Sequence, residues 1–341
     1  MQAARIHEDL TLRLDDVDTP KPGPGEVLVR IHAAGVCGTD LHILDGMIKP
    51  DPYPMILGHE AAGLVESTGD GVTLRPGDRV AIYNKIFCGH CEQCGKGRQN
   101  ICDEEPDQLG FNRDGGDAEY VVVPEKNAIA VPDGVDLATA AVLTCAGMTA
   151  MHATALSGLG SGDTAVVDGI GGVGILVVQA AAHAGARVIA VADSEDKLQL
   201  AHDHGAGDGV LVDTAESYDD LPGRIRELTN GRGTDAFFEL VGTTGSMTAG
   251  VRSLAKWGRF VSTGYTDQPI ELHPIEFILS ETSLISTVAA TPADLEAALA
   301  LSAAGGMRVP VAGRFPLAGV SDALAALRQR GVLGRQVLEL V

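Results

Sequence analysis

A glycine-rich turn between an apolar strand and an apolar helix constrains the fold of this chain more than any other feature. The segment "TAVVDGIGGVGILVVQAAAHAG" leads from a β-branched run into glycines spaced G-x-G-x-x-G and then into a helix-like apolar pattern. Gly169, Gly171 and Gly174 permit a tight turn and a close approach of the backbone to a pyrophosphate, which the start of a helix attracts. Since a second strand-like run, "RVIAVAD", follows, the segment predicts a dinucleotide-binding βαβ unit.

The second strand of this unit ends at Asp193, where a carboxylate would accept hydrogen bonds from the adenosine ribose hydroxyls and repel a ribose phosphate. No arginine follows it directly to receive a phosphate. We therefore expect the cofactor to be NAD rather than NADP. The residues predicted to contact it in this unit are Gly169, Gly171, Gly172, Val173, Gly174, Asp193 and Lys197.

Four of the six cysteines lie in the short segment "FCGHCEQCGKGRQNIC", as Cys88, Cys91, Cys94 and Cys102. Zinc prefers four tetrahedral ligands, and Cys-x-x-Cys steps let a tight loop wrap soft thiolates around one ion. Four thiolates leave no open position for water or substrate, so the spacing predicts a structural zinc site. His90 also lies in the loop, but the thiolates already complete the site. The alternative interpretation is four unrelated thiols.

The other two cysteines lie far from that loop, Cys37 in "AAGVCGTDLH" and Cys145 in "AAVLTCAGMTAMHA", while His59 stands beside Glu60 in "ILGHEAAGLVESTG". Two thiolates and an imidazole could hold a second zinc with its fourth position open, as a catalytic zinc needs. Spacing alone also allows His59 to be a packed or surface histidine and Cys145 to be a core residue.

These features occur in an order that is similar to one known family. From "GEVLVRIHAAGVCGTDLH" through "GHEAAGLV", the cysteine loop, "DGGDAEYVVVP" and the glycine-rich turn to "GRQVLELV", the chain resembles the zinc-dependent alcohol dehydrogenases of the medium-chain dehydrogenase/reductase superfamily. The resemblance covers essentially the whole chain and accounts for all six cysteines.

The resemblance implies an α/β fold of two domains. The first is an N-terminal β-rich (GroES-like) catalytic domain of residues 1–148 and 286–341, and the second is a doubly wound parallel-sheet Rossmann domain of residues 149–285. The patterns agree with it, because prolines, turn signals and β-branched residues dominate up to about Gly147, whereas strand and helix patterns alternate after it.

The resemblance also assigns roles to single residues. Cys37, His59 and Cys145 match the ligands of the catalytic zinc. Thr39 matches the hydroxyl residue that hydrogen-bonds the substrate oxygen, and His42 matches the histidine that passes the proton to solvent through the nicotinamide ribose.

Four further residues match supporting positions of the family. Asp40 corresponds to the carboxylate that orients the zinc-bound histidine, and Glu60 to the acid that lies behind the metal. Thr149 corresponds to a residue packed near the nicotinamide, and Arg335 to an arginine that contacts the pyrophosphate.

The implied activity is that of an NAD-dependent alcohol dehydrogenase with two zinc ions per subunit, which oxidises small-molecule alcohols to aldehydes or ketones. Two alternatives stay open: a polyol or sugar dehydrogenase, and a threonine-type amino-alcohol dehydrogenase. Many of those carry an acidic third ligand where Cys145 stands. A superfamily member without zinc chemistry is disfavoured, because Cys37, His59 and Cys145 match a full set of catalytic zinc ligands.

The segment "YNKIFC" before the cysteine loop bears on the substrate. It places Asn84 and Lys85 about where relatives that favour simple alcohols carry an apolar or aromatic pocket wall. A site built to hydrogen-bond a hydroxyl rejects analogues that lack one, so we expect a substrate with a second polar group near the carbinol. The alternative is a loop that faces solvent.

Composition limits the partners and the compartment. The net charge of -21 repels nucleic acid and anionic membranes, and no apolar run or leader predicts membrane insertion or export. We expect a cytoplasmic homo-oligomer, a tetramer or dimer, whose partner is its small-molecule substrate. The 28 aspartates against seven lysines indicate either adaptation to high salt or codon bias in an acidic proteome.

Three conspicuous side chains are predicted to have structural rather than catalytic roles. We expect Trp257 to pack on the sheet at a turn. His202 and His204 stand at an acidic helix end, where we expect them to face solvent.

Overall fold

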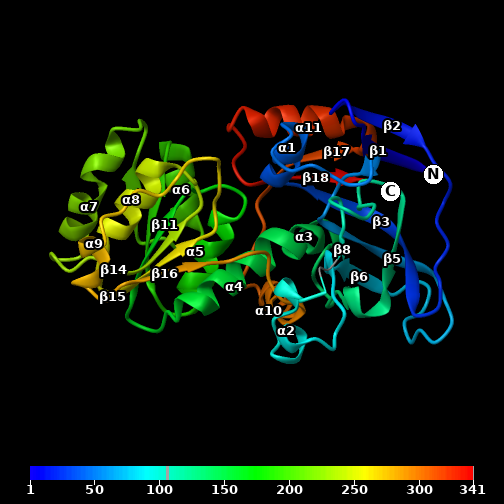
Figure 1. Cartoon of the computed structure of the whole chain (residues 1–341), viewed down its shortest axis with the longest axis horizontal. Helices are drawn as coiled ribbons and strands as arrows, with labels where there is room; N and C mark the ends of the chain where they lie inside the picture. The colour runs from blue at the N-terminus through cyan, green and yellow to red at the C-terminus, as the bar shows by residue number, and fades with distance from the viewer. Residues whose placement is uncertain (105–106, 341) are drawn as a thin grey trace. The chain divides into compact units, whose positions relative to one another are not determined.

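The computed structural model describes residues 1–104 and 107–340 and divides into two compact units. The first unit contains Met1–Met148, Ala290–Gly305 and Val309–Val341, and the second contains Thr149–Ala289 and Gly306–Arg308 (Figure 1). In this division the chain returns to the first unit at Ala290, shortly after a strand that ends at Ser286 and belongs to the sheet of the second unit. The predicted domain bounds stay a prediction.

The first unit is built on β-sheets. Its main sheet has the order β10-β6-β5-β3-β18-β17, and β9 also pairs with β3. These strands are β3 (Glu26–Val36), β5 (Ala61–Thr68), β6 (Arg79–Ile82), β9 (Tyr120–Pro124), β10 (Ala128–Ala130), β17 (Val311–Pro316) and β18 (Arg335–Glu339). Smaller sheets join β1 (Gln2–Ile6), β2 (Leu12–Asp16) and β4 (Met55–Ile56), and pair β7 (Lys85–Ile86) with β8 (Asp107–Gln108).

Apolar residues alternate along β3, which lies in the middle of the main sheet. Val27, Val29 and Ile31 are fully buried in one core together with Val65 and Val80 of the neighbouring strands. Strands with this alternation bury one face and leave the other to the next layer. The predicted β-rich character of the N-terminal part is confirmed.

Helices of mostly one to three turns complete the first unit. They are α1 (Gly38–Leu44), α2 (Glu92–Gly95), η1 (Gln99–Ile101), η2 (Glu125–Asn127), α10 (Pro292–Ala303), η4 (Leu317–Gly319) and α11 (Val320–Arg328). A continuous helical run of 21 residues is formed by α3 (Leu137–Val142), the π-helical turn η3 (Leu143–Gly147) and α4 (Met148–Ser157). This run meets the length and composition of a membrane span, but 67% of its most apolar window is buried, as in the core helix of a water-soluble protein.

The second unit contains one parallel sheet of six strands in the order β13-β12-β11-β14-β15-β16. The strands are β11 (Thr164–Asp168), β12 (Arg187–Ala192), β13 (Asp208–Leu211), β14 (Thr234–Glu239), β15 (Leu254–Ser262) and β16 (Ser283–Ser286). The helices α5 (Gly174–His183), α6 (Glu195–Asp203), α7 (Ser217–Leu228), α8 (Thr244–Arg252) and α9 (Ile275–Ile278) flank it (Figure 1). The predicted doubly wound fold is confirmed, and its strand order reverses between β11 and β14, where such sheets bind ligands.

Close packing of α8 against the sheet explains why position 250 is a glycine. The rings of Phe237 on β14 and Phe260 on β15 stack with their centroids 6.1 Å apart. A Cβ at Gly250 of α8 would lie 2.7 Å from an atom of each ring. The helix can therefore rest on the sheet only because that position has no side chain.

The predicted packing of Trp257 is wrong. Its side chain is 70% exposed, and its backbone adopts a left-handed conformation with φ 63°. The pairing of β14 with β15 shifts its register across this stretch, and such an irregularity turns a side chain out of the regular alternation. His202 is exposed as expected, whereas His204 is half-buried and its Nδ1 lies 2.8 Å from the Leu200 carbonyl oxygen.

Candidate functional site

The three predicted ligands of the catalytic zinc come together in the first unit. The sulfurs of Cys37 and Cys145, a ring nitrogen of His59 and a carboxylate oxygen of Glu60 all lie within 4.8 Å of one another. Cys37 precedes α1, His59 and Glu60 precede β5, and Cys145 lies in the π-helical turn. Two thiols with an imidazole and a carboxylate are a donor set that suits zinc.

The local environment prepares one thiol of this group to bind a metal. The hydrogen bond from Cys145 is the main influence that holds the pKa of the Cys37 thiol well below its usual value, and His59 lowers it further. The same bond raises the pKa of Cys145, since it keeps the shared proton. Thiolates rather than thiols bind zinc, so the lowered pKa of Cys37 favours metal binding at this group.

Asp40 joins two of the ligands. Its Oδ2 accepts a hydrogen bond from the Cys37 backbone N–H at 2.8 Å, and its Oδ1 lies 3.3 Å from Nδ1 of His59. A carboxylate at Nδ1 leaves Nε2 as the nitrogen that can bind a metal, which is the arrangement expected around a metal-bound histidine.

Glu60 and Arg335 form a buried ion pair beside this group. Nη2 of Arg335 lies 2.5 Å from Oε1 of Glu60 and also contacts Oε2, and both side chains are buried. Burial raises the pKa of Glu60 to about 7 although Arg335 opposes this. A Cβ at Gly35 would lie 1.9 Å from Oε2 of Glu60, so the glycine makes room for the pair. The predicted contact of Arg335 with a pyrophosphate stays a prediction.

Thr39 and His42 lie on α1, directly after Cys37. Oγ1 of Thr39 is 3.7 Å from Sγ of Cys37, and both Thr39 and His42 are half-buried. Residues three apart in a helix share one face, so the two side chains lie along the same side of α1.

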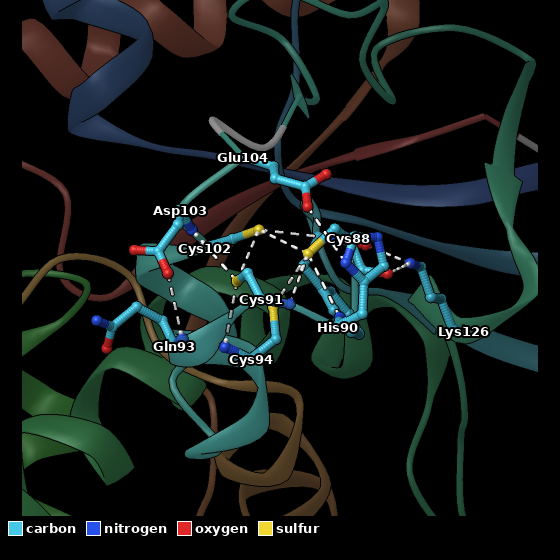
Figure 2. A network of polar contacts seen from close by, with 10 residues as sticks. Cys88, His90, Cys91, Gln93, Cys94, Cys102, Asp103, Glu104 and Lys126 are labelled. Atoms are coloured by element: carbon cyan, nitrogen blue, oxygen red, sulfur yellow. Dashed lines mark hydrogen bonds and ion pairs between the residues drawn. The ribbon is translucent and has the colours of Figure 1, made fainter.

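The four cysteines of the loop also gather into one group, as Figure 2 shows. Sγ of Cys102 lies 3.5 Å from Sγ of Cys88 and 3.8 Å from Sγ of Cys91. Backbone N–H groups point at the sulfurs, for example from Cys94 to Cys91 at 3.5 Å, and this N–H lowers the pKa of the Cys91 thiol to about 7. The geometry suits a closed tetrahedral zinc site.

A lysine holds the start of the cysteine loop. Nζ of Lys126 donates to the carbonyl oxygen of Cys88 at 3.2 Å (Figure 2). It also donates to the carbonyl oxygen of Phe87 and lies 4.6 Å from the centroid of the Phe87 ring. His90 is exposed and lies beside Glu104, so the four sulfurs group without it.

The glycine-rich turn of the second unit has the shape that a dinucleotide requires. Gly169 follows β11 with φ +99°, and a Cβ at Gly174 would lie 1.9 Å from the Gly169 carbonyl oxygen. At Gly171 a Cβ would meet no atom within 4 Å, so the turn leaves space there. The helix α5 begins at Gly174 and points its N-terminal amides toward the turn.

Asp193 follows β12 and forms an ion pair with Lys197, whose Nζ lies 2.7 and 3.0 Å from its two oxygens. The Asp193 side chain is 49% exposed and Lys197 is largely covered. Thr149 is buried in the first turn of α4. The contacts of these three residues with the cofactor stay predictions.

Sequence reasoning left the position of Asn84 open, and the structure buries it. Asn84 is 2% exposed, and its Nδ2 donates to the carbonyl oxygen of His59 at 3.0 Å, so the solvent-facing alternative is wrong. Lys85 donates instead to the Asn100 carbonyl oxygen at 3.0 Å, and burial lowers its pKa.

Asp117 was missed by sequence reasoning, although a charged residue directly after two glycines in "DGGDAEY" was a usable signal. It is 4% exposed, and the charges of Asp40, His59 and Glu60 act on its carboxyl. Burial raises the pKa of its carboxyl well above the usual value.

Comparison with known proteins relates the whole chain to one group of enzymes. Residues 23–133 match the family described as "Alcohol dehydrogenase GroES-like domain", and residues 172–304 match "Zinc-binding dehydrogenase". An alcohol dehydrogenase of Geobacillus stearothermophilus is 33% identical over 100% of both chains. An NAD-dependent alcohol dehydrogenase of Sulfurisphaera tokodaii is 34% identical over 99% of both. The crystal structure of the alcohol dehydrogenase from the archaeon Aeropyrum pernix superimposes with a TM-score of 0.91 at 33% identity, covering 99% of this chain and 100% of that one.

Proposed function

Because this chain belongs to the zinc-dependent alcohol dehydrogenases of the medium-chain dehydrogenase/reductase superfamily, we propose that Cys37, His59 and Cys145 hold its catalytic zinc. The chain transfers a hydride between an alcohol and NAD, with an aldehyde or ketone as the carbonyl product. The observation that carries the proposed site is the convergence of these ligand atoms with an oxygen of Glu60 within 4.8 Å.

Each neighbour of the ligands has a part in the proposed chemistry. When bound, zinc supplies a Lewis acid that lowers the pKa of the substrate hydroxyl. The Thr39 hydroxyl accepts the hydrogen bond of that hydroxyl, and His42 on the same face of α1 passes the proton to solvent. Asp40 fixes the ring of His59 through Nδ1. Glu60 and Arg335 neutralise each other beside the sulfurs.

The second unit holds the NAD in this proposal. The amides of the turn and of α5 bind the pyrophosphate, and Asp193 accepts hydrogen bonds from the adenosine ribose hydroxyls. Lys197 steadies that carboxylate through its ion pair. Thr149 and Arg335 are assigned to the nicotinamide and the pyrophosphate respectively.

Metal analysis together with two cysteine variants tests the sites. The native protein should contain two zinc ions per subunit, and Cys37→Ala should contain one, lose turnover by about a thousandfold or more and keep its fold. Cys91→Ala should also lose one ion but mainly lower the melting temperature, since it opens the structural site. One ion or none in carefully prepared native protein contradicts the two-site assignment.

We also propose that the chain forms homo-oligomers, as a dimer or a tetramer, in the cytoplasm. Among the described residues β16 is an edge strand of its sheet, and it contains no lysine or proline that would block pairing with another copy. Large apolar side chains near that edge are exposed, including Trp257, Ile278, Leu279 and Leu284. Leu284→Lys should reduce the mass measured by light scattering, and an unchanged mass contradicts the use of this edge.

A further inference from the structure

Asp117 lies against the segment that carries the zinc ligand His59. Its backbone is fixed on both sides, since its N–H donates to the Leu57 carbonyl oxygen at 2.9 Å and its carbonyl oxygen accepts from Ala4 at 2.8 Å. Its carboxyl occupies the space beside Gly58, where a Cβ would lie 2.2 Å from Oδ1. These backbone contacts hold Asp117 against the segment that carries His59.

The carboxyl has an unmet hydrogen-bonding requirement. Oδ1 of Asp117 is buried and has no hydrogen-bond partner among the residues that the structure describes. The carboxyl groups of Asp40 and Glu60, whose charges act on Asp117, donate no hydrogen bond to this oxygen. A buried polar atom without a partner destabilises a fold, so its retention needs an explanation, and a bound ligand is one.

Asn84 presents a second acceptor beside the segment that carries His59. Its Nδ2 is used by the His59 carbonyl oxygen, and its own carbonyl is held by the Leu109 N–H at 3.0 Å. Its Oδ1 is buried and unpartnered within residues 1–104 and 107–340. Asp117 at Gly58 and Asn84 at the His59 carbonyl thus place two unsatisfied acceptors next to one zinc ligand.

We propose that Asp117 and Asn84 bind a second hydroxyl of the substrate, on a carbon next to the carbinol, so that the chain prefers vicinal diols or polyols to simple alkanols. This inference rests on the proposed active site. An alcohol bound beside His59 would bring its neighbouring carbon toward these acceptors, and the single O–H of a hydroxyl there would be shared between the two oxygens as a three-centre hydrogen bond. An alkanol would leave the acceptors unpaired, which is the basis of strong discrimination.

The test compares catalytic efficiency with NAD for a vicinal diol and for the mono-alcohol of equal chain length. The native protein should favour the diol by about tenfold or more. Asp117→Leu should lower the diol to mono-alcohol ratio by about tenfold, Asn84→Leu should also lower it, and Asp117→Asn should restore part of it because the amide can still hydrogen-bond.

Asp114→Asn is the matched control. Asp114 lies three residues away, and its Oδ1 already accepts from the Ile56 N–H at 3.0 Å, so the control should keep the native ratio. A native preference for the mono-alcohol, or an unchanged ratio in both Asp117 variants, overturns the inference, including the case in which only a water fills the space. If no alcohol is oxidised while zinc and NADH are bound, the proposed function itself has failed. NADH fluorescence titration shows whether each variant is folded.

Discussion

Asp168 and Glu239 are register partners on the neighbouring strands β11 and β14, and both side chains are buried at the ends of these strands. The hydroxyl of Tyr218 donates to Oδ1 of Asp168 at 3.1 Å, and Glu239 accepts from the Ser246 hydroxyl at 2.7 Å. Each carboxyl keeps one buried oxygen that no described residue pairs. Like charges directly opposite each other destabilise a sheet, so this pair makes the stability of the second unit depend on pH.

The unfolding free energy should fall as pH rises above the ordinary pKa values of 3.8 for Asp168 and 4.5 for Glu239. Burial raises the pKa of both carboxyls in the folded state, and Glu239 raises that of Asp168 further. The folded protein therefore holds protons that the unfolded chain has lost, and the loss of stability continues until pH passes the raised pKa values. Urea unfolding at several pH values measures the slope.

Asp168→Asn removes one of the two acids and should flatten that slope. Asp163→Asn is the control, because the Asp163 carboxylate near the start of β11 is already paired with the Gly160 N–H at 2.9 Å. Equal slopes in the native protein and in Asp168→Asn would show that the pair does not titrate as argued.

Asp193 should determine the choice between NAD and NADP. Asp193→Gly removes the charge that repels a ribose phosphate and frees Lys197 to meet one. The ratio of catalytic efficiencies, NAD over NADP, should fall by about tenfold or more, as a change of about 1.4 kcal/mol in relative binding would give. Comparable efficiencies of the native protein with both cofactors would refute the role, and Asp196→Asn on the same helix serves as the control.

Lys126 should slow the release of the structural zinc. Its ammonium holds the carbonyls of Phe87 and Cys88, and its charge offsets the net negative charge of a zinc ion bound by four thiolates. Lys126→Met should release zinc to a colorimetric chelator about threefold to tenfold faster. Lys96→Met is the matched control, since Lys96 on α2 pairs with Glu92 instead. Equal rates of zinc release from Lys126→Met and Lys96→Met would show that Lys126 does not stabilise the structural site.

The melting temperature should rise between low and molar salt, by several degrees. The net charge of -21 makes the folded chain repel itself, and salt screens that repulsion. Differential scanning calorimetry across salt concentrations provides the measurement. A melting temperature that stays level would favour codon bias over salt adaptation as the origin of the composition.

The two groups of proposed zinc ligands could be predicted from the sequence because thiols are scarce in this chain and their chemistry is narrow. The π-helical turn that carries Cys145 could not, since five residues of a helix give no pattern that separates a wide turn from an ordinary one. The pairing of Asp168 with Glu239 depends on strand register between distant segments. The exposure of Trp257 depends on a left-handed backbone that the local apolar pattern does not encode.

The close approach of sulfurs in the cysteine loop makes the purified protein sensitive to oxidation once metal is removed. All six cysteines are free thiols, and the Cys88 and Cys102 sulfurs lie only 3.5 Å apart. In the proposed structural site zinc occupies those sulfurs, whereas a chelator in aerated buffer would expose them to oxidation. A disulfide formed there removes two ligands at once and prevents zinc from returning. Samples stripped of metal under reductant should therefore be reloadable, and samples stripped in air should lose that capacity with storage time.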